Sequence, residues 1–258
     1  MTRMQSGARE RPWTKASALV VALLVASPAT VADVVVIPAA KDNTLYESRT
    51  GGLSNGSGQR LFAGRTGSGG LRRGLVEFDI SGNVPAGSII SGATLTLNLI
   101  MTTSGPQTVS LHRVLADWGE GPSDAPGGEG IGTSSTPGDA TWIHTFFDTD
   151  FWSNAGGDFV AVPGSSGSVA GEGLYSWGPE VGMTADVQGW LDDSGGNHGW
   201  ILIGNEAFLP TAKAFASKEH PVPTLHPTLT VEFLIVTDDE DEDGDEDEDE
   251  DPDDEFGP

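Results

Sequence analysis

The chain has 258 residues and a formal net charge of −25, with 36 Gly, 16 Pro and no Cys. So many turn-forming residues exclude a helical bundle, and the lack of cysteine excludes disulfide scaffolds, cysteine-ligated zinc and thiol chemistry. The acidic balance argues against nucleic acid as a partner, because a polyanion is bound through clustered Lys and Arg side chains.

The first 32 residues have the layout of an export signal. Basic residues precede an apolar run at 16–26, and small residues at Ala29 and Ala32 suit a cleavage site. A membrane anchor is the alternative, but a run of this length covers only about half of the hydrocarbon core of a bilayer. We therefore predict that 1–32 is a signal peptide and that the mature protein is secreted or periplasmic, without a membrane span. Export without disulfides is typical of a bacterial protein.

Residues 33–237 form the expected domain, in which the dominant period is two. Apolar and polar residues alternate at 93–99 and 228–233, which is the pattern of half-buried strands. Further strands are expected at 34–37, 46, 61–63, 74–78, 109–114, 199–204 and 214–217. One short helix is expected at 183–191, with Thr184 as its cap. This pattern predicts an all-β fold, a jelly-roll-like β-sandwich with long Gly-rich loops and one short helix.

The stretch 117–175 combines aromatic residues with two Gly-rich segments, GGEGIGTSSTPG and PGSSGSVAGEG. Loops of this length in a compact domain tend to be functional or mobile. We expect their aromatic side chains to fold over one face or end of the sandwich.

The last 21 residues, 238–258, hold 16 acidic side chains and no basic one. Such a segment repels itself and cannot form a core, so we expect a disordered acidic tail. One register matches a calcium-binding loop with Asp239, Asp241, Asp243 and Glu250 as ligands. A solvated acidic terminus is the alternative, because almost any register of an Asp/Glu run fits that loop.

Short motifs in a fixed order along 40–234 resemble a known family. The first are Asp42-Asn43-Thr44-Leu45-Tyr46-Glu47, Leu61-Phe62-Ala63-Gly64, RGLVEFDI at 73–80 and VPAGSIISGATL at 84–95. Later ones are Leu111-x-Arg113-Val114, Trp118-x-Glu120, Ala140-Thr141-Trp142, Trp152 before Gly156-Gly157-Asp158, Thr184-x-x-Val187-Gln188-x-Trp190, Gly199-Trp200-Ile201-Leu202, Ser217-x-Glu219 and Pro227-x-Leu229-x-Val231. This ordered set resembles the DNRLRE domain, also classed as carbohydrate-binding module family 96.

The resemblance implies a jelly-roll-like sandwich that binds polysaccharide and has no catalytic activity of its own. It also implies a role beside secreted enzymes or surface proteins, to which such domains are usually appended. We therefore expect 33–237 to be an exported, noncatalytic polysaccharide-binding module. A calcium-responsive structural or cell-surface matrix protein, acting through 238–258, is the alternative, and a polysaccharide lyase or hydrolase is a third hypothesis.

Four tryptophans in the loop-rich half are candidate sugar contacts, because an indole face stacks on the apolar face of a pyranose. They are Trp118, Trp142, Trp152 and Trp177. A role in the core or in anchoring loops is the alternative for each. That alternative is stronger for Trp118 and Trp142, which lie inside the family motifs.

The only local basic cluster of the expected domain lies between positions 60 and 73. Guanidinium groups pair bidentately with carboxylates such as those of uronate sugars, so this cluster favours an acidic glycan. Its candidate ligand contacts are Arg60, Arg65 and Arg72. Arg73 is instead expected to pair within the protein, with Glu77, Asp79 or Glu219.

Loop carboxylates provide candidate ligands for a structural calcium ion. They are Asp42, Asp139, Asp148, Asp150 and Asp158, and the spacing of Asp148 and Asp150 suits a loop site. Surface solvation is the alternative. Calcium is thus the cofactor that the sequence suggests.

Catalytic signatures are nearly absent. Residues 52–56 spell G-x-S-x-G, but a nucleophile elbow needs a strand before it and a helix after it, and here both neighbours are Gly-rich. His144 and Tyr175 could serve a polysaccharide lyase, although no motif supports that pair. We therefore expect a protein that is not an enzyme.

Overall fold

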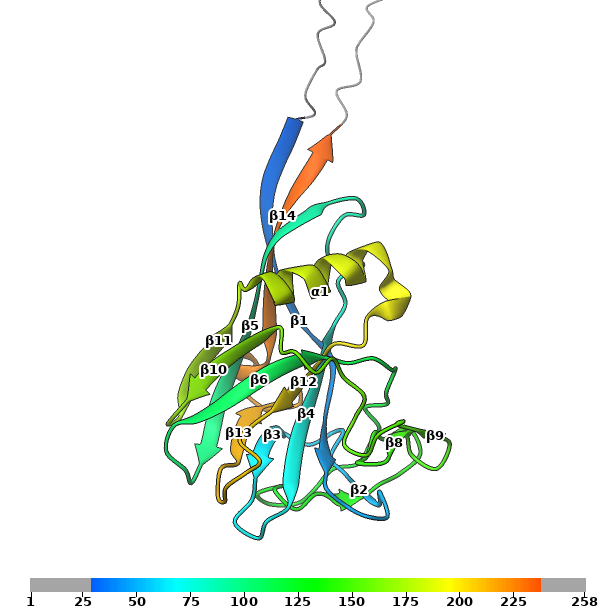
Figure 1. Ribbon diagram of the computed structural model, residues 1–258, viewed down its shortest axis with the longest axis vertical. Helices are drawn as coiled ribbons and strands as arrows, with labels where there is room; N and C mark the ends of the chain where they lie inside the picture. The colour runs from blue at the N-terminus through cyan, green and yellow to red at the C-terminus, as the bar shows by residue number, and fades with distance from the viewer. Residues whose placement is uncertain (1–28, 238–258) are drawn as a thin grey trace, which may run out of the picture.

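The computed structural model describes residues 29–237, in which strands and long loops surround one α-helix (Figure 1). The strands are β1 (Ala29–Tyr46), β2 (Leu53–Ser54), β3 (Arg60–Arg65), β4 (Leu71–Phe78), β5 (Ile89–Thr102), β6 (Gln107–Arg113), β7 (Thr133–Ser134), β8 (His144–Phe146), β9 (Asp150–Phe151), β10 (Ser165–Val169), β11 (Gly173–Trp177), β12 (Trp200–Ile203), β13 (Lys213–Ala216) and β14 (Thr228–Thr237). The helix is α1 (Val181–Asp192), and η1 (Ser194–Gly196) and η2 (Pro223–Leu225) are single 3-10 turns. Within 29–237, no helix is long and apolar enough to cross a bilayer.

The strands form two antiparallel layers, and β1 belongs to both. Its first part, 29–38, pairs with β14, and that layer continues through β5 to β13 and β3, with β11 also on β5. Its second part, 39–46, pairs with β4, and that layer continues through β12 to β6 and β10. Pairing of β3 with β4 joins the layers at one end. The predicted all-β sandwich with one short helix is confirmed.

The main hydrophobic core lies between the two layers. Strand β5 shows how the sequence builds it, because Leu95, Leu97 and Leu99 are buried while the intervening Thr96 and Asn98 are partly exposed. Alternate residues of a strand point to opposite faces, so this alternation gives β5 one apolar face. The predicted period of two is therefore the period that fills the core.

The helix α1 closes one end of this core. It runs from Val181 to Asp192, slightly beyond the predicted 183–191, and its buried residues are Met183, Val187, Trp190 and Leu191. Thr184 is not its cap as predicted: the cap position is Glu180, which makes no side-chain capping bond, and the Thr184 hydroxyl donates to the Glu180 carbonyl instead. Packing of the apolar face, rather than capping, therefore stabilises this helix.

A second hydrophobic core lies on the outer face of the β4 layer. In β4, Val76 packs into the main core and its neighbour Leu75 into the second one, and in β12 Ile201 joins Leu75. Loop residues between positions 114 and 159 complete this second core. The long loops thus cover a sheet face, as their aromatic content predicts. They hold the candidate sites described next.

Strands β1 and β14 form a two-stranded arm that extends beyond the rest of the domain (Figure 1). Val31, Val34 and Val36 are exposed on it. Strand β1 begins at Ala29, so the described structure includes the last four residues of the predicted signal peptide. The rest of that segment, and the predicted tail at 238–258, lie outside the described residues.

Candidate functional site

The four tryptophans that are candidate sugar contacts are all buried. They are Trp118, Trp142, Trp152 and Trp177, with exposed fractions of 1%, 9%, 6% and 2%. The indole N–H of Trp118 donates to the carbonyl of His198 and that of Trp152 to the carbonyl of Thr141, both at 2.9 Å. A ring packed inside the protein offers no face to a sugar. The four side chains therefore fill the hydrophobic cores and anchor loops, which is the alternative role that the sequence predicts for them.

The predicted arginine cluster makes its contacts within the protein. Arg60 pairs with Glu129 at 2.9 Å, and Arg65 donates to backbone carbonyl oxygens. Arg72 is 5% exposed, and its guanidinium lies 4.7 Å from the ring centre of Tyr46. These internal contacts account for the cluster without a ligand.

Arg73 is held by three hydrogen bonds to other protein groups. Its Nε and Nη2 donate to the two carboxylate oxygens of Glu206 at 2.7 and 2.9 Å, and Nη1 donates to the carbonyl of Gly156 at 2.8 Å. The guanidinium also lies over the rings of Trp142 and Phe159, 5.0 and 5.5 Å from their centres. The prediction that Arg73 pairs internally is correct, but the three carboxylates named for it were wrong.

A cleft of about 530 Å³ opens beside Arg73. Arg73 comes from β4, and the other walls come from the segment after β6 and from the loop 153–159. The lining includes Leu115, Ser153, Asn154, Asp158 and Phe159. Apolar and hydrogen-bonding groups thus share one cleft on the loop-covered side of the domain.

Asp158 fixes the loop that lines this cleft. Its carboxylate accepts hydrogen bonds from the backbone N–H groups of Ser153 and Asn154 at 2.6 and 2.9 Å, and from the Asn154 side chain at 2.9 Å. Partial burial raises the pKa of Asp158, but these hydrogen bonds outweigh it and hold the pKa below its usual value. Asp158 is therefore an ionised, fully engaged carboxylate.

The predicted calcium ligands do not come together as a group. Asp148 and Asp150 are exposed, and Asp158 caps its own loop. Asp139 is fully buried but accepts hydrogen bonds from Ser123 and Thr136. The four tail residues Asp239, Asp241, Asp243 and Glu250 lie outside the described residues, so their predicted role stays a prediction.

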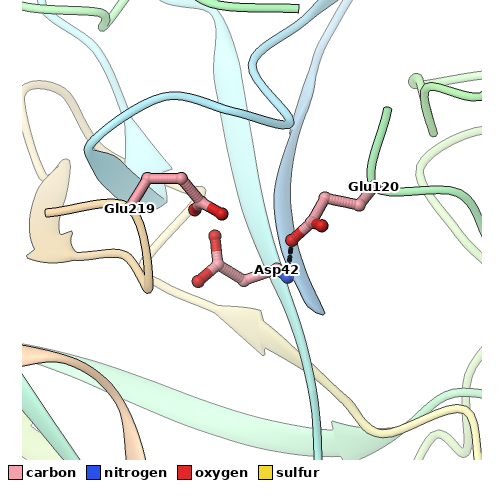
Figure 2. Close-up of side chains that lie close together, drawn as sticks. All are labelled: Asp42, Glu120 and Glu219. Carbon is pink, nitrogen blue, oxygen red and sulfur yellow. Dashed lines mark hydrogen bonds between the residues drawn. The ribbon is translucent and has the colours of Figure 1, made fainter. Parts of the chain in front are cut away.

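Three other carboxylates do come together (Figure 2). Asp42 comes from β1, Glu120 from the loop after β6 and Glu219 from the loop after β13. One oxygen from each lies within 4.8 Å of the others, and within 29–237 no other trio of potential ligands has this geometry. We call this trio the acidic cluster. Of its members, the sequence singled out only Asp42 as a calcium candidate.

Hydrogen bonds hold the acidic cluster in place. The backbone N–H of Asp42 donates to Glu120 Oε1 at 2.8 Å, and the backbone N–H of Lys218 donates to Asp42 Oδ2 at 2.7 Å. The Lys218 ammonium lies 3.2 Å from Glu120 Oε1 and also pairs with Glu219. Within 29–237, Asp42 has no ion pair of its own.

The electrostatics of the acidic cluster reflect an excess of negative charge. Burial raises the pKa of Asp42 well above its usual value, and repulsion from Glu219 and Glu120 adds to that. Burial also raises the pKa of Glu120. Partial burial lowers the pKa of Lys218, but the two neighbouring glutamates outweigh it and raise the pKa overall. Three carboxylates thus lie beside a single lysine, Lys218.

The groups considered for catalysis are separated or engaged elsewhere. The ring of His144 packs against those of Phe147 and Phe151, and burial lowers its pKa. The hydroxyl of Tyr175 donates to the carbonyl of Gly171, and its ring packs on the main core, so the proposed pair is not assembled. Ser54 of the G-x-S-x-G match is buried and donates to the carbonyl of Ala140.

No family model matches the chain, and no curated protein matches it either. The resemblance to the DNRLRE domain therefore stays a prediction. The motifs behind it still carry information, because the acidic residues of Trp118-x-Glu120 and Ser217-x-Glu219 are the ones that meet Asp42. The acidic residues that recur in these ordered motifs were the signal that could have found the cluster.

Proposed function

We propose that the described domain is a noncatalytic module that binds a neutral polysaccharide in the cleft beside Arg73. The observation that supports this best is the composition of the cleft. The half-buried ring of Phe159 and the apolar Leu115 lie beside Ser153 and Asn154, which can exchange hydrogen bonds with hydroxyl groups. An apolar or aromatic surface with a few polar groups is the combination that binds sugars.

The charge of the cleft supports a neutral ligand over a uronate. The positive charge of Arg73 is paired bidentately with Glu206, and the ionised Asp158 also lines the cleft. A uronate carboxylate would meet Asp158 at close range and would compete with Glu206 for Arg73. The expectation of an acidic glycan depended on Arg60, Arg65 and Arg72, whose contacts are internal.

The distribution of carboxylates supports binding rather than hydrolysis. Glycoside hydrolysis by the usual mechanism needs two carboxyl groups on either side of the scissile bond. Among residues 29–237, Asp158 is the one carboxylate that lines the cleft, and three hydrogen bonds engage it. The acidic cluster contributes no residue to the lining of the cleft.

Native affinity electrophoresis of the full chain tests this proposal. The gels contain neutral polymers (hydroxyethylcellulose, xylan or laminarin) or uronate polymers (alginate or polygalacturonate). We expect retardation by a neutral polymer, and a loss of affinity of roughly tenfold in Phe159→Ala or Asn154→Ala. Phe208→Ala is the matched control, because Phe208 is 70% exposed and lies outside the cleft.

Two results would overturn the proposal. Retardation that Phe208→Ala weakens as much as Phe159→Ala would place binding elsewhere on the domain. Retardation by uronate polymers alone would contradict the charge argument. If no polymer retards the chain, the binding function fails, and the alternative of a calcium-responsive matrix protein acting through 238–258 becomes the hypothesis to test.

A further inference from the structure

The positive charge that neighbouring side chains provide does not neutralise the negative charge of the acidic cluster. Three carboxylates share one ammonium, that of Lys218, which contacts Glu120 and Glu219. With all groups ionised, this leaves a formal charge of −2. A divalent cation would balance that charge.

Asp42 points to a ligand independently of the clustering. It is 2% exposed, its carboxylate points toward that of Glu219 (Figure 2), and no cationic side chain of 29–237 forms an ion pair with it. The oxygen Glu219 Oε2 is also buried and accepts no hydrogen bond from the described residues. Buried carboxylates are normally paired with a cation or coordinate a metal. Lys218 pairs with the other oxygen of Glu219, so a cation between Asp42 and Glu219 Oε2 would neutralise the negative charge that remains.

The ligand atoms and their spacing indicate which ion fits. All of them are carboxylate oxygens, which hard cations prefer. The oxygens of the acidic cluster lie within 4.8 Å of one another, so one ion can contact all three. Mg²⁺ is usually held by one or two carboxylates and keeps several waters, whereas Ca²⁺ accepts more carboxylates in a flexible geometry, so three carboxylates favour Ca²⁺.

We propose that Asp42, Glu120 and Glu219 bind one calcium ion. The ion links β1 to two loops that are distant in the sequence, and Lys218 completes the charge balance. Of its three ligands, only Asp42 was among the calcium candidates predicted from the sequence. It does not depend on the proposed glycan function.

Calcium titration of the full, chelator-treated chain tests the site. Binding is followed by calorimetry and stability by thermal unfolding, in wild type, Glu219→Gln and Glu120→Gln. The matched control is Glu172→Gln, which removes an exposed carboxylate between β10 and β11. The segment 238–258 is the same in every variant, so any weak binding by it cancels in the comparison.

We expect one saturable calcium site per chain in wild type and in Glu172→Gln, and affinity at least tenfold lower in Glu219→Gln and Glu120→Gln. At calcium about 100 times the dissociation constant, the wild-type melting temperature rises by roughly 5 °C or more, and that rise is lost in both cluster variants. Near-ultraviolet circular dichroism checks that each variant keeps the packing of its tryptophans.

Three outcomes would overturn the proposal. In the first, all four proteins bind calcium alike. In the second, wild type shows no saturable site above the diffuse binding of its acidic residues. In the third, calcium leaves the wild-type melting temperature unchanged, and Glu219→Gln and Asp42→Asn raise the melting temperature of the calcium-free protein. That result would mean that the facing carboxylates share a proton and bind no calcium ion.

Discussion

Lys213 is a buried cation whose replacement tests how the loops are fixed to the sandwich. It lies in β13 and is fully buried. Its ammonium donates to Thr102 Oγ1 at 3.1 Å, to the carbonyl oxygens of Ser104 and Gly105 at 3.0 and 2.9 Å, and to that of Ala170 at 2.7 Å. It therefore joins the turn between β5 and β6 to the end of β10. Lys213→Met keeps the length of the side chain and removes every donor.

The expected cost follows from the oxygens that lose their donor. A buried acceptor left unsatisfied costs about 1–3 kcal/mol, but Gly105 is exposed and Ser104 partly so, and water can replace the donor there. Removing the ammonium also removes the penalty of burying its charge. We expect the free energy of unfolding to fall by about 2–4 kcal/mol, and the melting temperature by roughly 5–15 °C.

Urea denaturation and scanning calorimetry of the full chain measure this change. Arg49→Met is the control, because Arg49 is exposed and an exposed substitution changes stability by less than about 0.5 kcal/mol. A Lys213→Met variant that is as stable as wild type, or more stable, would refute the reasoning. It would show that the burial penalty of the ammonium cancels its hydrogen bonds.

Three further predictions concern the cleft and the acidic cluster. Arg73→Lys loses the bidentate pair with Glu206, and we expect urea denaturation to show a free energy of unfolding that is lower by about 2–3 kcal/mol. A decrease of less than about 0.5 kcal/mol would contradict this. Because the pKa of Asp42 is raised in the folded state, calcium-free wild type should gain stability relative to Asp42→Asn as the pH falls from 7 toward the unfolded value of 3.8. A stability difference between wild type and Asp42→Asn that does not change with pH would contradict this prediction. Because the pKa of Asp158 is lowered in the folded state, its contribution to folding stability is present above pH 3.8 and is lost as the pH falls through the folded pKa. We expect Asp158→Ala to lower the free energy of unfolding by about 1–2 kcal/mol at pH 7. Equal urea midpoints for Asp158→Ala and wild type would exclude this stabilising role.

The strands and the helix could be predicted because their signals are local. The alternation at 93–99 and 228–233 became β5 and β14, and the apolar residues of 183–191 became the buried face of α1. The division of β1 between two sheets could not be predicted in this way. Residues 29–46 form one continuous strand with an irregularity between Ala39 and Lys41, and the partners β14 and β4 decide to which layer each part belongs.

The site residues were harder to predict because their partners lie far away in the sequence. Arg73 pairs with Glu206, 133 positions further along the chain, and no local pattern distinguishes that glutamate from others. Three of the four candidate tryptophans do lie in the loop layer, and Trp177 ends β11 in the main core, but composition does not tell which side of a loop faces the sheet. Trp118 and Trp152 face it, while the cleft uses Phe159, which the sequence did not single out.

Hydrogen–deuterium exchange with a bound oligosaccharide tests the central claim most directly, because it shows where the sugar lies. The full chain is compared with and without a hexasaccharide of the neutral polymer that retards it: cellohexaose, xylohexaose or laminarihexaose. The cleft proposal predicts slower exchange in 115–116 and 153–159, with no change in the β1–β14 arm. Protection confined to the arm, or to the turn between β5 and β6, would contradict it.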